Sequence, residues 1–179
     1  MPTVDRDEND FFNVCSQCKS SCCVGARPPL THERMGIIQK YLDERNVPLR
    51  EPFVQASYAF PREDAENYCV FNDRKTGKCI IHAVKPETCI AGPITFDINI
   101  KTRKIEWHLK KETICRLAGR LYADKKRLAR HQTLAKKEIL SLVRKLDAEA
   151  LRAILKIEEP ETFKISEDNL EKTILAKLI

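Results

Sequence analysis

Eight cysteines in a chain of 179 residues are the feature that most restricts how this sequence can fold. A chain of this length buries a real hydrophobic core, so it needs no cross-links to rescue a very small fold. It begins MPTVDRDEND, which lacks the basic and apolar stretches of a secretory signal. We therefore expect a cytoplasmic protein, in which thiols stay reduced and a cysteine pattern indicates metal binding or catalysis rather than disulfides.

Four of the cysteines stand close together in the segment Cys15-Ser-Gln-Cys18-Lys-Ser-Ser-Cys22-Cys23. A C-x2-C turn brings two sulfur atoms close enough to share one metal, and a third cysteine four positions later completes a face of the site. Thiolates suit both zinc and iron–sulfur clusters, which favour soft, charged sulfur. The side chains of the adjacent pair Cys22 and Cys23 diverge, so one of them can serve a second metal or point elsewhere.

The other four cysteines are spread further along the chain. Cys69, Cys79 and Cys89 follow one another at intervals of ten, and Cys115 lies at the predicted start of a helix. The helix dipole favours a thiolate there, although a single cysteine is more often a buried apolar side chain. Eight thiols match two four-thiolate sites, or one site with spare thiols. The histidine best placed as an auxiliary ligand is His82, and a hydrogen-bonded structural role is its commoner explanation.

Other uses of cysteine are open as well. A cysteine with a histidine can be a nucleophile and its base, and exposed thiols of low pKa can form a redox sensor. So many thiols make metal ligation the simpler interpretation. The five glycines stand apart from one another and form no phosphate-binding loop. The sequence thus identifies neither a substrate nor a catalytic residue.

Hydrophobic periodicity predicts an α+β fold, with a small cysteine-rich metal-binding core, a β-hairpin and a long α-helical C-terminal region. The hairpin is predicted from alternating apolar residues in 94–100 and 105–109, on either side of a basic turn. Before it, Thr31 is expected to cap a helix. Short strands are predicted at 70–71 and 80–81, next to a turn.

The remaining segments are less regular. Residues 46–68 contain three prolines and are expected to form a mostly irregular connection. From Thr113 onward the apolar pattern predicts packed helices, with a turn or an exposed stretch around 124–132. Asp147 is expected to cap a short helix, and Ser166 to cap a final helix that reaches the C-terminus.

The positive charge is concentrated in one segment. The whole chain carries a net charge of +6, and residues 101–157 alone contain 17 basic and 6 acidic residues. This excess leaves nucleic acid or an acidic protein open as a partner, although a solvated helix face is the commoner explanation. No stretch approaches 18 consecutive apolar residues, so no membrane partner is expected.

Taken together, the cysteine motifs resemble those of the YkgJ-type cysteine-cluster family, zinc- or iron-chelating proteins named for a CxxCxxCC motif. The first motif matches with one extra residue before the cysteine pair. The second runs from Cys79 to Cys89 and contains Lys85-Pro86-Glu87-Thr88-Cys89, where the family has Arg/Lys-Pro-x-x-Cys. The resemblance covers 11–118, which we take as a cysteine-cluster domain, and 119–179 is taken as a helical C-terminal region.

This resemblance implies metal ligation by the cysteines of both groups. The implied ligands are Cys15, Cys18, Cys22, Cys23, Cys69, Cys79, Cys89 and Cys115. An iron–sulfur cluster, [4Fe–4S], is the first expectation, with a redox or modification-associated role. A related cysteine cluster occurs in flagellin lysine N-methylases, so an oxidoreductase or a methyltransferase-related protein is open. The alternative is a structural zinc module whose basic region 101–157 binds nucleic acid or a protein partner.

Overall fold

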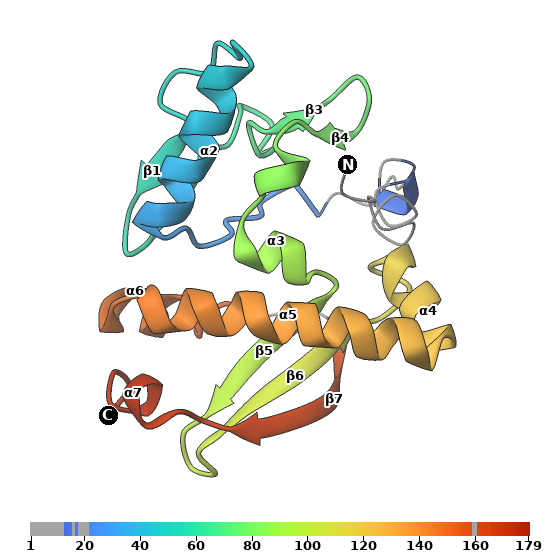
Figure 1. Ribbon diagram of the computed structural model, residues 1–179, viewed down its shortest axis with the longest axis vertical. Helices are drawn as coiled ribbons and strands as arrows, with labels where there is room; N and C mark the ends of the chain where they lie inside the picture. The colour runs from blue at the N-terminus through green and yellow to red at the C-terminus, as the bar shows by residue number, and fades with distance from the viewer. Residues whose placement is uncertain (1–12, 16, 18–21, 159–160) are drawn as a thin grey trace.

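The computed structural model describes residues 13–15, 17, 22–158 and 161–179 of the chain. It consists of two halves, one above the other in Figure 1. The upper half contains helix α2 and two small hairpins, and the lower half contains a three-stranded sheet crossed by helix α5. This arrangement confirms the predicted α+β class, including the hairpin and a long helix in the C-terminal region. Among the described residues, no helix combines the length and apolar character needed to span a membrane.

The upper half is organised around one capped helix. Its elements are α2 (His32–Glu44), β1 (Phe53–Gln55), β2 (Ala59–Pro61), β3 (Asn72–Asp73) and β4 (Lys78–Cys79). Thr31 caps α2, as predicted, because its Oγ1 accepts a hydrogen bond from the Arg34 N–H at 3.1 Å. The helix packs on the hairpins through a small apolar cluster, which we call the upper core. Its buried residues are Leu30, Ile38, Leu42, Ala59, Phe71 and Ile81.

Residues 46–68 are mostly irregular, as predicted, and contain one short antiparallel pair, β1–β2. The positions of the two predicted short strands were wrong in detail. Strands β3 and β4 lie nearer the turn than the strands predicted at 70–71 and 80–81. The turn between them is tight because the Asp73 carboxylate accepts a hydrogen bond from the Thr76 hydroxyl at 2.6 Å, so pairing begins closer to it.

The lower half is built on an antiparallel sheet with the strand order β5-β6-β7. Its strands are β5 (Ile94–Asn99), β6 (Lys104–Lys110) and β7 (Thr162–Asn169). The first two form the predicted hairpin, in which Ile94 pairs with Leu109 and Ile98 with Ile105. Alternate side chains of β6, including Trp107, are fully buried because one face of the sheet packs against the helices.

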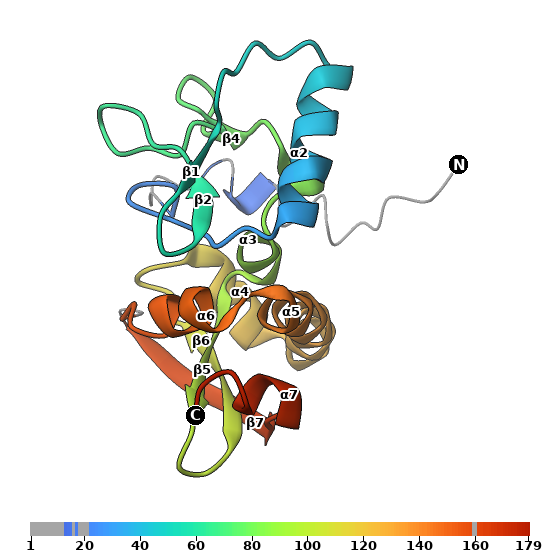
Figure 2. The ribbon, with the colours of Figure 1, turned by 90° about the vertical axis from the view of Figure 1, so that its left-hand side faces the viewer.

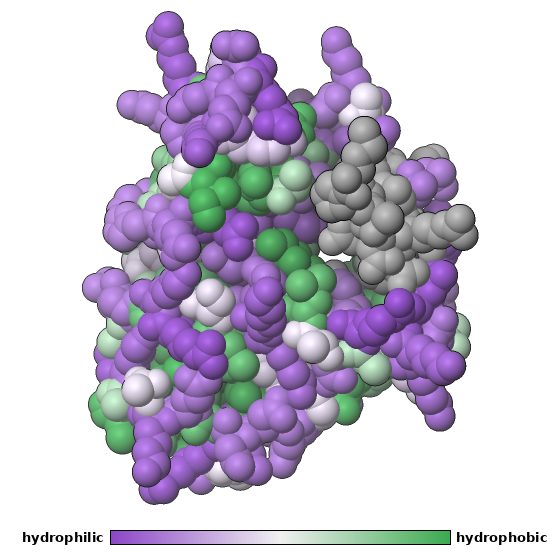
Figure 3. All heavy atoms as spheres, in the orientation of Figure 1, coloured by the Kyte–Doolittle hydropathy of each residue, from purple (hydrophilic) through white to green (hydrophobic). Residues whose placement is uncertain are grey.

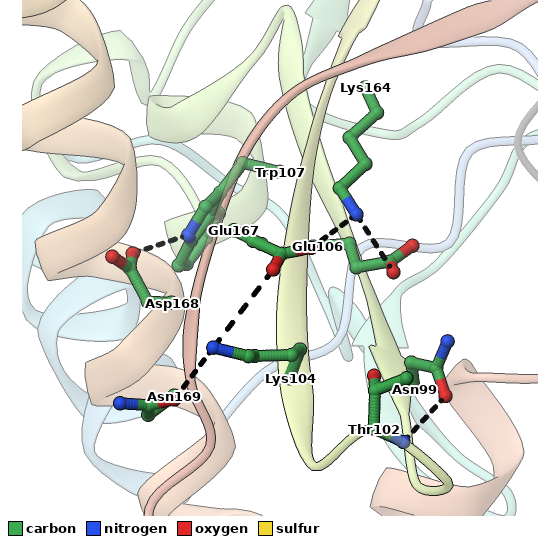
Figure 4. Close-up of polar contacts among 9 residues, drawn as sticks. All are labelled: Asn99, Thr102, Lys104, Glu106, Trp107, Lys164, Glu167, Asp168 and Asn169. Carbon is green, nitrogen blue, oxygen red and sulfur yellow. Dashed lines mark hydrogen bonds and ion pairs between the residues drawn. The ribbon is translucent and has the colours of Figure 1, made fainter.

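Strand β7 replaces the helix that Ser166 was expected to start. Ser166 lies within the strand, opposite Trp107 of β6, and the last helix, α7 (Lys172–Leu175), begins six residues later. Polar side chains connect the two strands, as Figure 4 shows. The Trp107 Nε1–H donates to Asp168 Oδ2 at 2.7 Å, and the Lys164 ammonium donates to Glu106 Oε1 at 3.0 Å. Pairing with β6 therefore decides the conformation of this segment.

Aspartates cap two of the three helices that follow the hairpin. The three helices are α4 (Arg116–Ala123), α5 (Lys125–Lys145) and α6 (Ala148–Ile154). Asp124 accepts hydrogen bonds from the backbone N–H groups of Lys126 and Arg127, which separates α4 from α5 at the predicted turn. Asp147 caps α6 as predicted, through the Ala150 N–H at 2.8 Å.

A short segment joins the two halves and continues into the sheet. It contains the 3₁₀ turn η1 (His82–Val84) and the helix α3 (Glu87–Ala91), which packs on α5. Figure 2 shows α3 between the upper half and α5. The Arg34 guanidinium contacts Glu87 at 3.1 Å and Glu138 at 3.4 Å, so one cation connects α2, α3 and α5. This junction carries one of the cysteines of the candidate site.

Candidate metal centre

Four cysteines from separate segments gather where the upper half meets the junction. Cys22 comes from the N-terminal segment, Cys69 and Cys79 from the turn before β3 and the end of β4, and Cys89 from α3. The Cys89 thiol lies within electrostatic range of the other three. Cys22 in turn acts on both Cys69 and Cys79. We call these four side chains the thiol cluster.

Backbone pairing brings the N-terminal cysteine pair to the rest of the cluster. Val24 and Tyr68 form an isolated antiparallel bridge. On one side of it, the Cys69 N–H donates to the Cys23 carbonyl oxygen at 2.8 Å. This contact is independent of the side chains, so it fixes Cys23 and its neighbour Cys22 beside Cys69 even in the absence of a metal.

Two loops present their cysteines in the same way. In Cys69-Val70-Phe71 and in Cys79-Ile80-Ile81, the backbone N–H of the third residue is hydrogen-bonded to the thiol of the first. Both third residues, Phe71 and Ile81, are fully buried in the upper core and anchor the loops. Each hydrogen bond lowers the pKa of its thiol, because an N–H donor stabilises the thiolate. The same donors would orient and stabilise thiolate ligands of a metal.

Burial acts on the thiol cluster in the opposite direction and is the larger effect at three of its members. It raises the pKa of Cys69 to about 11, and it also raises the pKa of Cys79 and of Cys89. Cys89 retains accessible surface, yet the protein atoms around its sulfur displace enough water to produce this shift. A hydrogen bond with Cys23 is the main reason that the pKa of Cys22 is raised. Without a metal, these thiols are therefore protonated at neutral pH.

Two cations border the thiol cluster. The Lys85 ammonium acts on Cys22, Cys79 and Cys89, and the Lys110 ammonium acts on Cys22. Lys85 Nζ also lies 3.5 Å from Nε2 of His82. Burial and this neighbouring charge lower the pKa of His82 to about 4, so the ring is neutral at pH 7. The charge of Lys85 was not predicted to matter from the sequence, although Lys-Pro-x-x-Cys places this lysine four residues before Cys89.

The other predicted ligands lie elsewhere or outside the described residues. Cys115 stands at the N-cap of α4 and packs with Val14 and the apolar face of that helix. Cys15 follows Val14 and is exposed. Cys18 lies outside the described residues. The structure thus places Cys22, Cys23, Cys69, Cys79 and Cys89 together, and Cys115 beside α4.

The described side chains do not by themselves form a metal site with its ligands in place. Among the described residues, no three histidine, cysteine, aspartate or glutamate side chains converge closely enough to hold one metal ion. None of the seven described cysteines is joined to another by a disulfide. The ligand set of the centre therefore stays a prediction.

Comparison with known proteins gives the family. A family model described as "CxxCxxCC: Putative zinc- or iron-chelating domain" matches residues 14–138, which is more than half of the chain. The chain belongs to this family. The match includes both cysteine groups and continues through α4 into α5. No curated protein and no solved structure matches. Membership of the CxxCxxCC family supports metal binding by the cysteines and leaves the choice between zinc and iron open.

Proposed function

We propose that this protein carries an iron–sulfur cluster, [4Fe–4S], bound by the thiol cluster of Cys22, Cys69, Cys79 and Cys89. The observation that carries the proposal is that four thiols from four separate segments lie within electrostatic range of one another. Such a cluster takes four cysteine thiolates, which is the number gathered here. The remaining cysteines are proposed ligands of a second centre. They are Cys15, Cys18, Cys23 and Cys115.

The four cysteine donors fit a [4Fe–4S] cluster better than they fit a zinc site that combines cysteine with histidine. The donors are all sulfur, whereas many structural zinc sites include a histidine. The nearest histidine, His82, has its Nε2 next to the Lys85 ammonium at 3.5 Å. The N–H donors on Cys69 and Cys79 are also the kind of contact that adjusts the potential of a cluster. When bound, the cluster would supply one-electron chemistry for a redox or modification-associated role, and its reduced thiolates suit the cytoplasm.

Metal analysis tests the proposal directly. We expect protein purified without oxygen to be brown, with iron and about four acid-labile sulfides for each cluster. Iron, sulfide and zinc should be measured on the same sample, together with its absorption spectrum. Colourless protein with stoichiometric zinc and no sulfide would contradict the iron–sulfur proposal and leave the zinc alternative.

Single substitutions then test the proposed ligands. We expect Cys69→Ser and Cys89→Ser each to lose the cluster of the first centre, because a hydroxyl is a poor replacement for a thiolate ligand. Cys115→Ser is the matched comparison, since Cys115 packs beside α4 and belongs to the proposed second centre. It should lower the iron content by about half if two similar centres are present. Retention of all iron in Cys89→Ser would remove that residue from the site.

The alternative function is a zinc module that binds nucleic acid or a protein. It is favoured by an exposed basic surface on α4 and the start of α5. The exposed basic residues are Arg116, Arg120, Lys125, Lys126 and Arg130. Figure 3 shows a predominantly hydrophilic surface over α4 and the adjoining end of α5. Fluorescence anisotropy with labelled DNA and RNA tests it, because binding through phosphates must weaken steeply as salt is added. If the protein binds neither DNA nor RNA at low salt, the basic residues form only a solvated surface, and nucleic-acid binding is excluded.

A further inference from the structure

A groove beside helix α4 lies away from the thiol cluster and combines apolar and aromatic side chains. Its volume of about 400 Å³ falls within the range of about 300–1,000 Å³ that is usual for small-ligand sites. Leu109 of β6 and Ala118 of α4, both fully buried, line it together with Tyr122 of α4 and Phe163 of β7. The groove is therefore formed where these three elements meet.

Tyr122 is the most exposed aromatic side chain at this groove. It keeps 65% of its surface accessible, and its ring meets that of Phe163 edge to face, with the centroids 5.5 Å apart. A single exposed aromatic side chain on a protein surface needs no explanation. A ring that is held by a second ring and still borders a groove is suited to stack on a planar group.

Glu112 and Gly119 restrict what the groove can hold. A Cβ atom at Gly119 would overlap the Glu112 carboxyl group, so the absence of a side chain there lets Glu112 lie across α4 at the edge of the groove. Its carboxylate repels a phosphate but accepts hydrogen bonds from the N–H groups of a nucleobase. The groove thus fits an uncharged planar group better than it fits an anion.

The surface around the groove has the opposite charge preference. Residues 110–130 contain eight basic and two acidic side chains. Lys111 lines the groove, Lys125 and Lys126 follow Tyr122 closely in the chain, and all three are exposed. An uncharged planar group flanked by negative charges matches this arrangement. Single-stranded nucleic acid has that form, because its bases are unpaired and accessible between its phosphates.

We propose that this groove and the lysines beside it bind single-stranded nucleic acid, with one base stacked on Tyr122 and the adjoining phosphates near Lys111, Lys125 and Lys126. The inference deepens the nucleic-acid alternative given above and rests on the basic surface described there. It is independent of which metal the cysteines bind.

Oligonucleotides with and without bases test the inference. Fluorescence anisotropy is measured with a labelled single strand of about 12 nucleotides, prepared as DNA and as RNA, and with an abasic DNA strand of the same length. The variants are Tyr122→Ala, Tyr122→Phe and Lys125→Gln. Ile157→Ala is the matched control, because Ile157 is also an exposed apolar side chain and follows α6, at the opposite end of α5 from α4 (Figure 1). Each titration is repeated at several salt concentrations.

The expected results separate stacking from charge. Tyr122→Ala should weaken binding of the intact strands about tenfold without changing the salt dependence, because a stacked ring carries no charge. Tyr122→Phe and Ile157→Ala should stay within about threefold of wild type. Lys125→Gln should reduce the slope of log affinity against log salt by about one. Wild type should bind the abasic strand as weakly as Tyr122→Ala binds the intact DNA strand.

Two kinds of failure are distinguishable. If wild type binds no strand at low salt, the nucleic-acid alternative and this inference are both overturned. If wild type binds but Tyr122→Ala matches it, or weakens the abasic and intact strands equally, this inference alone is overturned. Circular dichroism checks that the variants fold. Should Tyr122→Ala not fold, Tyr122→Leu makes the same comparison, because it keeps apolar bulk without a ring.

Discussion

His131 illustrates how one side chain supports the junction that carries Cys89. It is buried on α5, and its Nε2 lies 2.9 Å from the carbonyl oxygen of Ala91 and 3.0 Å from that of Gly92. Because both partners are acceptors, Nε2 must carry the proton and donate to them. Carbonyls at the end of a helix lack intrahelical partners, so the imidazole satisfies the C-terminal end of α3. Burial lowers the pKa of His131 even though these carbonyls favour its charged form.

Substitution of His131 should change both stability and its dependence on pH. We expect His131→Gln to cost about 1–2 kcal/mol at pH 7.5, because buried carbonyls lose a donor. The pKa of His131 in the folded protein lies below the value of about 6.5 in the unfolded chain. The unfolded state therefore binds more protons as the pH falls through this range, and stability is lost on acidification. The variant should lose less stability than wild type between pH 7.5 and 5.5 in urea unfolding.

An exposed histidine provides the control for this measurement. His32 lies on the surface at the start of α2, so His32→Gln should leave the pH dependence close to that of wild type. The lowered pKa of His82, about 4, acts in the same direction and should leave a residual slope in the His131 variant. An unchanged slope in His131→Gln would mean that this histidine is not held neutral by the fold.

At the scale of elements, β7 shows how tertiary pairing overrides a local signal. Ser166 followed by acidic residues is typical of a helix start, and this pattern predicts a helix here. Yet Phe163 and Ile165 pack against the buried core of the lower half, and β6 needs a partner on its second edge. Seven paired positions along β6 and the bond from Trp107 to Asp168 together outweigh a single capping preference.

The contribution of this bond can be measured by substitution. Asp168 accepts from the fully buried Trp107 indole at 2.7 Å and pairs with Lys136 at 2.7 Å. We expect Asp168→Ala to lower the free energy of unfolding by about 1–3 kcal/mol, since it leaves a buried N–H without its acceptor. Glu167→Ala is the matched control, because Glu167 is exposed and its ion pairs with lysines should contribute under about 1 kcal/mol. Equal losses in the two variants would contradict the importance of the indole bond.

At the scale of the whole molecule, the two halves differ in how they are stabilised. The lower half buries a large core between its sheet and the helices that pack on it. The upper core is small, and the strands of the two hairpins beside it are only two or three residues long. Strands this short are marginal without further support. A metal bound by Cys69, Cys79 and Cys89 would connect the loops of the upper half to α3.

Removal of the metal should therefore loosen the two halves to different extents. Binding of a metal to the folded state alone adds its free energy to the stability of the segments that hold it. We expect a chelator to speed amide hydrogen exchange in α2 and around Phe71 by about tenfold or more. Exchange in β6, around Trp107, should change much less. Hydrogen-exchange mass spectrometry of holo and chelated protein gives the measurement, and a uniform change in both halves would contradict this division.

The sequence by itself determined the features that depend on local pattern. Thr31 and Asp147 cap helices, the 94–109 hairpin forms, and the cysteine motifs give the CxxCxxCC family, because caps, alternation and motif spacing act over a few residues. Only the tertiary structure decided which thiols lie near one another and that β7 is a strand. These outcomes depend on pairing between segments distant in sequence, whose free energy comes from burial and hydrogen bonds that no local pattern encodes.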